Sequence, residues 1–341
     1  MEQILSALRA AGEPTRLRLL ALLAQSELTV SEITHIMGQS QPRISRHLKL
    51  LADAGLVERY REGNWAFYRM ARPSVFSRGM SDIPALAASL VSFLPQDDGI
   101  LQGDRGRLET VRRDRADAAA DYIRTNADEW GRIQALHLPE EAIENAVVDI
   151  IGPEPVARHV DLGTGTGRML EVLAHRTQDA VGIDFSHDML ALARTNLERA
   201  GLTRTQVRHG DIFALSLPPR FATLVTIHQV LHFLADPGKA VEEAARVLAP
   251  NGRVLIIDFE AHGLEFLREN HAHRRLGFSD GEVCEWFNAC GLTLEGRRAL
   301  PNETHPAPED GPSLTVCLWL GRKRPGMTVS QETTTQDMEI S

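Results

Sequence analysis

A glycine-rich turn between an apolar segment and a helix constrains the fold of this chain more than any other feature. Residues 157–162 predict a buried strand with Asp161 near its end, and glycines at positions 163, 165 and 167 follow it directly. Glycine lets the backbone of such a turn approach a ligand closely. A strand, a glycine-rich turn and a helix together predict the first unit of a Rossmann-like α/β sheet.

The spacing of the glycines distinguishes two kinds of nucleotide-binding turn. Dinucleotide-binding turns follow the pattern G-x-G-x-x-G, whose last glycine would fall at Arg168 here. Gly163, Gly165 and Gly167 alternate instead, and Asp161 precedes the first of them by two residues. The pattern D-x-G-x-G-x-G resembles motif I of the class I methyltransferases that use S-adenosylmethionine (SAM). The resemblance implies that SAM is the cofactor.

Further predicted strands follow at the spacing of that family, and the resemblance over residues 107–322 is closest to its UbiE-like branch. The strands are expected at 180–184, 207–212, 224–228 and 247–257, with the last two near 290–292 and 314–320. Asp184 ends the second strand, where a carboxylate can accept from both ribose hydroxyls. In the family, the acid at position 211 accepts from the adenine amino group. The predicted SAM site consists of Asp161, Gly163, Gly165, Gly167, Asp184, Phe185, Met189, Asp211, Ile212 and His228.

Two histidines follow the fourth predicted strand, whose end faces the donor methyl group in the family. A sulfonium donor is already activated, so the protein mainly orients the reactants and no single catalytic residue is required. A neutral imidazole near pH 7 can nevertheless remove a proton from an acceptor, which makes His228 and His232 the candidate catalytic residues. The alternative is that they contact the methionine part of SAM or cap a helix.

Three more histidines, His262, His271 and His273, lie farther along the chain. Residues i and i+2 of a helix point to different faces, so His271 and His273 are poorly placed to share an ion, and no metal site is predicted. Their roles stay open between a lid over the substrate and a solvated helix. The three cysteines form no C-x-x-C pair, which disfavours a disulfide framework and a zinc ribbon.

The first 71 residues carry the pattern of a helix-turn-helix. Residues 29–32 form a capping box that begins a short helix, which ends near Gly38, and Ser40 caps the helix that follows. This third helix, predicted over 41–56, buries one apolar face and exposes polar and basic side chains. Such a helix fits the DNA major groove, where Arg and Gln pair with base edges and Lys with phosphates.

A hairpin predicted over residues 56–70 completes a winged helix-turn-helix. Residues 40–70 resemble the ArsR family of dimeric bacterial repressors, and the resemblance extends over about residues 4–94. It implies a homodimer that reads a palindromic double-stranded DNA operator. A winged helix used for protein contact is the alternative. The predicted DNA-binding residues are Ser40, Gln41, Arg43, Ser45, Arg46, His47, Lys49 and Arg61.

The metal-sensing sites of the ArsR family are not reproduced in this sequence. Metal-sensing members carry two cysteines before the recognition helix, where this chain has Thr29 and Ser31, and a hydroxyl is a poor ligand for a soft metal. The other family site uses Asp and His after the wing, where residues 73–94 contain Asp82 but no His. We therefore expect a signal other than a metal or arsenite, or no signal.

Charge and length predict two domains with different partners. The net charge of the 341 residues is −9, but residues 1–90 carry +3 and the remainder −12, so one end can meet an anion. No apolar run approaches the length of a membrane helix, and we expect a soluble cytoplasmic protein without membrane contact. The predicted parts are a winged-helix domain over 1–94, a linker and helical lead-in over 95–153 with a solvated helix at 107–120, a methyltransferase domain over 154–322 and a disordered tail over 323–341.

Two functions from different classes are compatible with these motifs. The first is a DNA-binding transcriptional regulator whose effector is SAM or its demethylated product S-adenosylhomocysteine (SAH). A DNA-reading head, two absent metal sites and an intact nucleoside site favour it. The second is an enzyme that methylates a small-molecule acceptor, with the winged helix serving for dimerisation or autoregulation.

Overall fold

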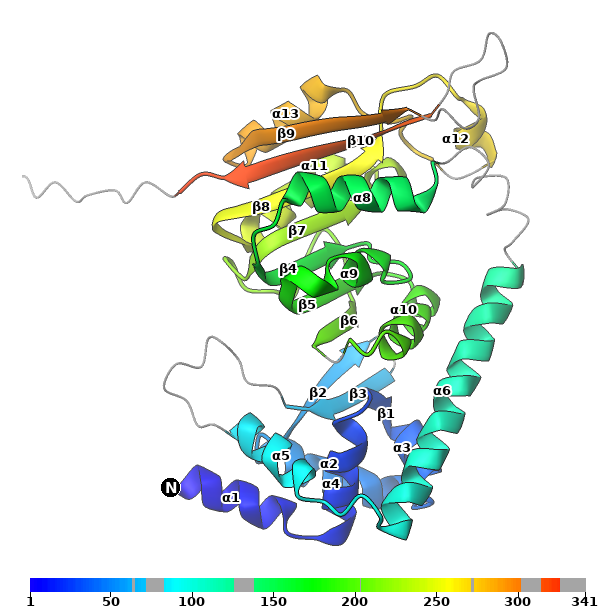
Figure 1. Cartoon of the computed structure of the whole chain (residues 1–341), viewed down its shortest axis with the longest axis vertical. Coiled ribbons are helices and arrows are strands. Elements are labelled where there is room, and N and C mark those ends of the chain that lie inside the picture. Colours follow the sequence, from blue (N-terminus) through cyan, green and yellow to red (C-terminus); the bar gives the residue numbers. More distant parts are fainter. Residues whose placement is uncertain are drawn as a thin grey trace, which may run out of the picture. The chain divides into compact units, whose positions relative to one another are not determined.

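The computed structural model describes residues 1–62, 65–71, 83–125, 138–202, 204–270, 273–301 and 314–325 (Figure 1). The chain divides into two compact units, one formed by residues 1–137 with 161–215 and the other by residues 138–160 with 216–341. No helix in the described ranges is long and apolar enough to cross a membrane.

The winged helix-turn-helix lies in the first unit. Its helices are α1 (Glu2–Ala11), α2 (Pro14–Leu23), α3 (Val30–Met37), α4 (Gln41–Asp53) and α5 (Ile83–Ser92), and its strands β1 (Leu28–Thr29), β2 (Val57–Glu62) and β3 (Trp65–Met70). The strands pair antiparallel in the order β1-β3-β2. The predicted capping box joins Thr29 and Glu32 at the start of α3, and Gly38 ends that helix with a left-handed backbone. Helix α4 ends earlier than predicted, since Gly55 adopts a positive φ.

A long helix, α6 (Gly99–Thr125), belongs to the same core (Figure 1). Its Leu108 and Val111 are buried in the apolar cluster of the winged helix, so the solvated helix expected over 107–120 is wrong for these residues. Arg18 of α2 donates to both carboxylate oxygens of the buried Asp104 in α6, at 2.7 and 2.8 Å. This bidentate pair ties α6 to the winged helix.

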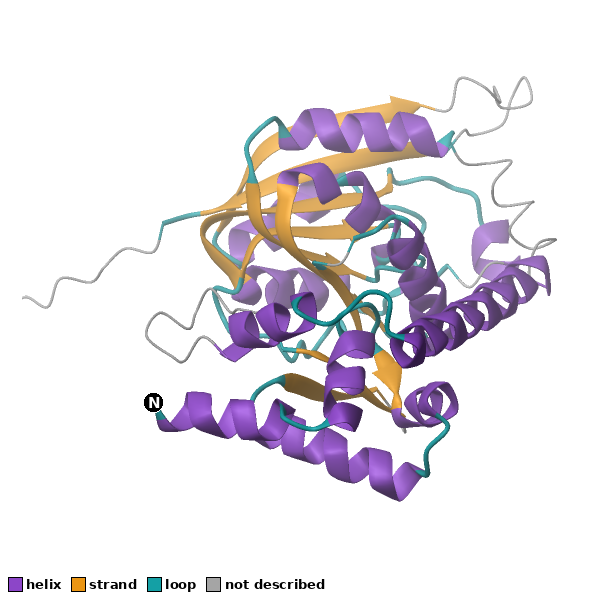
Figure 2. Ribbon diagram, turned by 60° about the horizontal axis from the view of Figure 1, so that its bottom comes forward, coloured by secondary structure: helices purple, strands orange, loops and turns teal. Residues whose placement is uncertain are grey.

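Seven strands form the second sheet, in the order β6-β5-β4-β7-β8-β10-β9; they are labelled in Figure 1, and Figure 2 draws the strands in orange. They are β4 (Val156–Leu162), β5 (Thr177–Asp184), β6 (Thr205–His209), β7 (Ala222–His228), β8 (Leu248–Phe259), β9 (Leu292–Pro301) and β10 (Thr315–Lys323). Strand β5 is parallel to β6 and β7 to β8, while β10 is antiparallel to β8 and β9. A sheet rich in parallel pairs, with helices between the strands, confirms the predicted Rossmann-like fold.

The remaining helices alternate with these strands. The first unit contains α9 (Arg168–Val172), the 3₁₀-helix η1 (Ala174–Arg176) and α10 (His187–Arg199); the second contains α8 (Glu140–Ile151), η2 (Leu231–Phe233), α11 (Pro237–Val247), α12 (Phe266–Asn270) and α13 (Asp280–Ala289). The third strand of this sheet is shorter than predicted, because the Asp211 carboxylate accepts from Phe213 N at 2.9 Å and turns the chain. The predicted tail lies outside the described residues from position 326 onward.

Candidate functional site

The alternating glycines form a turn with a left-handed backbone after β4. The φ angles of Gly163, Gly165 and Gly167 are 68°, 51° and 85°, values that favour glycine over any residue with a Cβ. The backbone N–H groups of Gly163 and Thr164 both donate to Ile183 O in β5, at 2.7 and 3.0 Å. The turn is therefore held against the neighbouring segment before any ligand arrives.

Two carboxylates brace this turn. Asp161 is buried and accepts a hydrogen bond from the Thr164 hydroxyl at 2.7 Å. Asp184 accepts from Gly165 N through one oxygen and from Ser186 N through the other, each at 2.8 Å. A carboxylate oxygen has a second lone pair, so Asp184 can still accept from a ligand hydroxyl. The sequence did not reveal the bracing role of Thr164, although a hydroxyl three residues after an acid is a recognisable signal.

Flat side chains flank the turn at the ends of β5 and β6. Phe185 is 76% exposed, and its ring lies 5.3 Å from that of His209, which stacks on His187 at 4.2 Å. Met189 is half-buried at the start of α10, and its N–H donates to Ser186, the N-cap of that helix. Asp211 is exposed, and Ile212 beside it is half-buried. An exposed aromatic ring such as that of Phe185, close in sequence to Asp184, suits stacking with a planar nucleobase.

The two candidate catalytic histidines lie in the second unit. His228 ends β7, and burial lowers its pKa to about 4, so its ring is neutral at pH 7. His232 lies in η2, and a hydrogen bond of 2.7 Å joins its Nδ1 to Oδ1 of Asp258 in β8. Both partners are buried. Since a carboxylate only accepts, Nδ1 is the donor and Nε2 is left free to receive a proton.

The sequence analysis did not identify Asp258 as a candidate site residue. It stands within a strand whose other residues from position 254 to 259 are all apolar. A lone acid in a buried apolar strand needs a partner, which is the signal that could have found it. His232, its partner, is 26 positions away.

The other histidines lie near the same pair. His273 is buried and its ring lies 4.3 Å from that of His232, so the solvated-helix alternative is wrong for His273. Burial lowers the pKa of His262, whose Nδ1 accepts from Leu264 N. His271 lies outside the described residues. Within the described ranges, no three His, Cys, Asp or Glu side chains are placed to hold a metal ion.

Helix α4 presents most of the residues predicted to read DNA. Gln41, Arg43, Arg46 and Lys49 are exposed, and Ser45 is half-buried. His47 is half-buried, which lowers its pKa, and its Nδ1 lies 3.7 Å from Glu13. Ser40 occupies the N-cap position, but its hydroxyl makes no capping hydrogen bond. The side chain of Arg61 lies outside the described residues.

Two family models match the chain. Residues 160–256 match the model described as "Methyltransferase domain", and residues 13–59 match "Bacterial regulatory protein, arsR family". Among solved structures, YcgJ of Bacillus subtilis is similar over 54% of this chain and 98% of its own, with a TM-score of 0.45 and 22% identity.

Relatives with described functions are also of two kinds, methyltransferases and an ArsR regulator. The demethylmenaquinone methyltransferase of Thermus thermophilus is 36% identical over 171 residues, which cover 48% of this chain and 73% of that protein. The arsenic resistance transcriptional regulator ArsR1 of Pseudomonas putida is 45% identical over 60 residues, 17% of this chain and 47% of that protein. The phosphatidylethanolamine N-methyltransferase of Cereibacter sphaeroides is 35% identical over 102 residues, 30% of this chain and 50% of that protein. The chain thus spans about half the length of the last two relatives.

Proposed function

We propose a function from one premise: this chain belongs to the family of SAM-dependent methyltransferases that includes the demethylmenaquinone enzymes, and it carries an ArsR-type helix-turn-helix in front of that domain. The proposal is a transcriptional regulator whose affinity for its operator depends on whether SAM or SAH occupies the methyltransferase domain. The braced glycine turn, with Asp161 and Asp184, would hold the nucleoside. Reading an operator requires a cytoplasmic location.

The observation that carries this proposal is the position of α10. At one side the helix supports the glycine turn: Gly167 approaches Ala193 so closely that an added Cβ would lie 3.3 Å from the alanine Cβ. Asn196 Nδ2 donates to Thr166 O at 3.0 Å. The N-cap residue of α10, Ser186, follows Asp184 by two positions. A ligand bound at the turn therefore acts on α10 directly.

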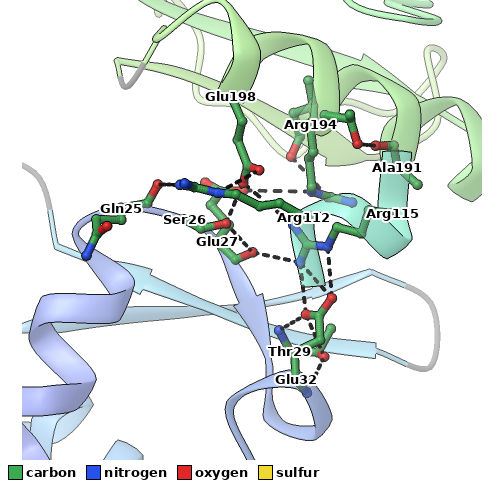
Figure 3. Close-up of polar contacts among 12 residues, drawn as sticks. Gln25, Ser26, Glu27, Thr29, Glu32, Arg112, Arg115, Ala191, Arg194 and Glu198 are labelled. Carbon is green, nitrogen blue, oxygen red and sulfur yellow. Dashed lines mark hydrogen bonds and ion pairs between the residues drawn. The ribbon is translucent and has the colours of Figure 1, made fainter. Parts of the chain in front are cut away.

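Another side of α10 contacts the winged helix (Figure 3). Glu198 accepts from the Ser26 hydroxyl, and its carboxylate lies 3.2 Å from Arg112 and 3.6 Å from Arg115 of α6. Arg194 lies over the ring of Phe67 in β3, 4.3 Å from its centroid. The same helix thus supports the glycine turn and holds the wing.

Arg115 connects this network of ion pairs to helix α3 of the helix-turn-helix. Its guanidinium donates to both oxygens of Glu32, at 2.8 and 2.9 Å, and to Glu27 O at 3.0 Å. Glu32 is the residue whose carboxylate completes the capping box of α3, the helix before α4. A shift of Glu198 is therefore transmitted to the N-terminus of α3 through one arginine.

A ligand shifts an equilibrium only by its different affinity for two conformations. SAM is a sulfonium cation and SAH is neutral, so one site can distinguish them by charge. A cavity of about 360 Å³ lies beside the ion pairs and is lined in part by Arg69, Arg194 and Glu198.

The partners follow from the winged helix. We propose a homodimer on a palindromic double-stranded DNA operator, because a two-fold protein reads a two-fold site. The exposed Gln41, Arg43, Arg46 and Lys49 would enter the major groove. The His232–Asp258 pair favours, in addition, methyl transfer to a small-molecule acceptor, and the two activities are compatible in one chain.

The test is fluorescence anisotropy on DNA from immediately upstream of the chain's own gene, at fixed salt, without ligand, with SAM and with SAH. We expect the two ligands to change operator affinity differently, by about fivefold or more. The Asp184→Ala variant should lose ligand binding and the response together. The Glu198→Gln variant should still bind SAM but lose most of the response.

The matched control is Glu295→Gln, which breaks a surface ion pair with Arg322 far along the chain and should respond like the wild type. Tight operator binding that SAM and SAH leave unchanged would refute the effector role. An unchanged response in Glu198→Gln would refute the route through α10.

A further inference from the structure

Buried polar atoms at the carboxyl ends of β7 and β8 have no hydrogen-bond partner among the described residues. They are Nε2 of His228, Nε2 of Gln229, Oδ2 of Asp258 and Nε2 of His262. A buried polar atom left unpaired costs about 1–3 kcal/mol, so several at one edge indicate a place for a polar ligand. The carboxyl ends of strands are also where open α/β sheets bind ligands.

The backbone at this edge is strained. Gln229 has a φ of 52°, in the left-handed region that residues with a Cβ seldom adopt. Its N–H donates to Ile257 O at 2.7 Å, which holds it in this conformation between β7 and β8. Strain of this kind accumulates where a site requires a fixed geometry.

We propose that His232 and Asp258 form a proton-accepting pair, and that the methyl acceptor is a hydroxyl group on an aromatic ring. The proposal rests on the proposed function only in that the domain transfers the methyl group of SAM. His232 is the catalytic residue, since its Nε2 would receive the proton. Asp258 is a positioning residue, which fixes the tautomer of His232 and stabilises the imidazolium.

Among amine, carboxylate and hydroxyl acceptors, the hydroxyl is the class that needs this pair. A neutral amine attacks a sulfonium with its own lone pair, and a carboxylate is already an anion, so neither requires a base before attack. A hydroxyl oxygen must lose its proton as it attacks. The O–H bond then breaks to His232 Nε2, the C–O bond forms, and the C–S bond breaks with its electron pair passing to sulfur, which leaves neutral SAH.

The side chains around the pair favour an aromatic acceptor. Phe233 is 45% exposed, and the centroid of its ring lies 4.1 Å from that of His232. Phe233 also meets His273 edge-on at 5.3 Å, and His273 packs on the buried Phe259. A partly exposed aromatic residue beside the base offers a planar acceptor ring a partner for stacking.

The experiment uses the full chain, SAM with a labelled methyl group, and three probes: para-methoxyphenol, the more acidic para-nitrophenol, and para-toluidine as an amine. We expect methyl transfer to the phenols and not to the amine. The His232→Gln and Asp258→Asn variants should lower kcat for para-methoxyphenol about a hundredfold. The loss for para-nitrophenol should be much smaller, because this phenol ionises without a base.

The control is Asp149→Asn, which removes an exposed carboxylate of α8 paired with Arg298. Equal losses for both phenols would give Asp258 and His232 a structural role only, and transfer to the amine alone, or to no phenol, would refute the acceptor class. SAM binding measured by calorimetry separates the two proposals. Wild-type protein that does not bind SAM would refute the proposed function, whereas SAM binding with an operator response but no phenol methylation would refute only this inference.

Discussion

His159 in β4 is a buried titratable residue outside both proposed sites. Its side chain is fully buried, and Nε2 lies 2.7 Å from the Thr226 hydroxyl. Burial lowers its pKa from 6.5 to about 3. Below about pH 6.5, His159 therefore binds a proton in the unfolded chain but not in the folded protein. The free energy of unfolding decreases as the pH falls from 6.5 toward 3.

The contribution of His159 is fully present above pH 6.5 and should decrease by up to about 2 kcal/mol by pH 5. Urea unfolding of the wild type and of His159→Gln, at pH 7 and pH 5, measures it. The wild type should lose more free energy of unfolding than the variant between the two values. Equal losses would show that His159 does not titrate in this way.

Individual residues show how far sequence reasoning reaches. The alternation of Gly163, Gly165 and Gly167 was informative because each position needs a positive φ, a local requirement that glycine meets. Asp258 was not found because its role depends on a contact with His232 in η2, 26 positions away. A backbone conformation that one residue type favours can be predicted from the sequence, whereas a contact between residues far apart in the chain cannot.

At the scale of elements, β5 approaches the glycine turn closely at Gly182. A Cβ added there would lie 2.6 Å from the Thr164 hydroxyl and 2.8 Å from Leu170. Gly182→Ala should destabilise the protein by about 1–3 kcal/mol and weaken SAM binding, because Thr164 would move off Asp161. Thermal unfolding and calorimetry measure both effects. Gly106→Ala, where nothing lies within 4 Å, is the control: it should leave SAM binding unchanged and, inside helix α6, raise stability by up to about 1 kcal/mol. An unaffected Gly182→Ala would contradict the close approach.

Helix α4 carries the prediction for DNA. Arg46 is exposed on it, and Arg46→Ala should weaken operator binding by about 1–3 kcal/mol if the side chain reads a base edge. Anisotropy at matched salt measures the loss. Arg298→Ala, a surface substitution in the second unit, should bind normally. Operator affinity unchanged in Arg46→Ala would remove Arg46 from the interface.

Helix α6 begins at Gly99, earlier than the helix predicted over residues 107–120. Its first turns contain Gly99, Gly103 and Gly106, which lower helix propensity and favoured a break there. Burial of Leu108 and Val111 in the winged-helix core outweighs that preference. The strands of the second sheet, whose apolar runs are buried, were predicted more closely.

At the scale of the whole molecule, the winged helix and the methyltransferase domain could both be predicted, because each has motifs of its own that are close together in the sequence. The contacts that join the winged helix to α10 were not foreseeable. Arg115 and Glu32 are 83 positions apart, and Ser26 and Glu198 are 172 apart. Ion pairs at such separations have no periodicity or spacing that a single sequence displays.

The ion pair between Arg18 and the buried Asp104 has a consequence for how this architecture can be inherited. A fragment that ends after the wing would leave Arg18 without its carboxylate and would uncover the apolar surface that Leu108 and Val111 occupy. The reading head is thus not a freely transferable module, and recombination between such genes would have to break beyond the middle of α6. The winged helix and the first half of α6 are therefore expected to be inherited together.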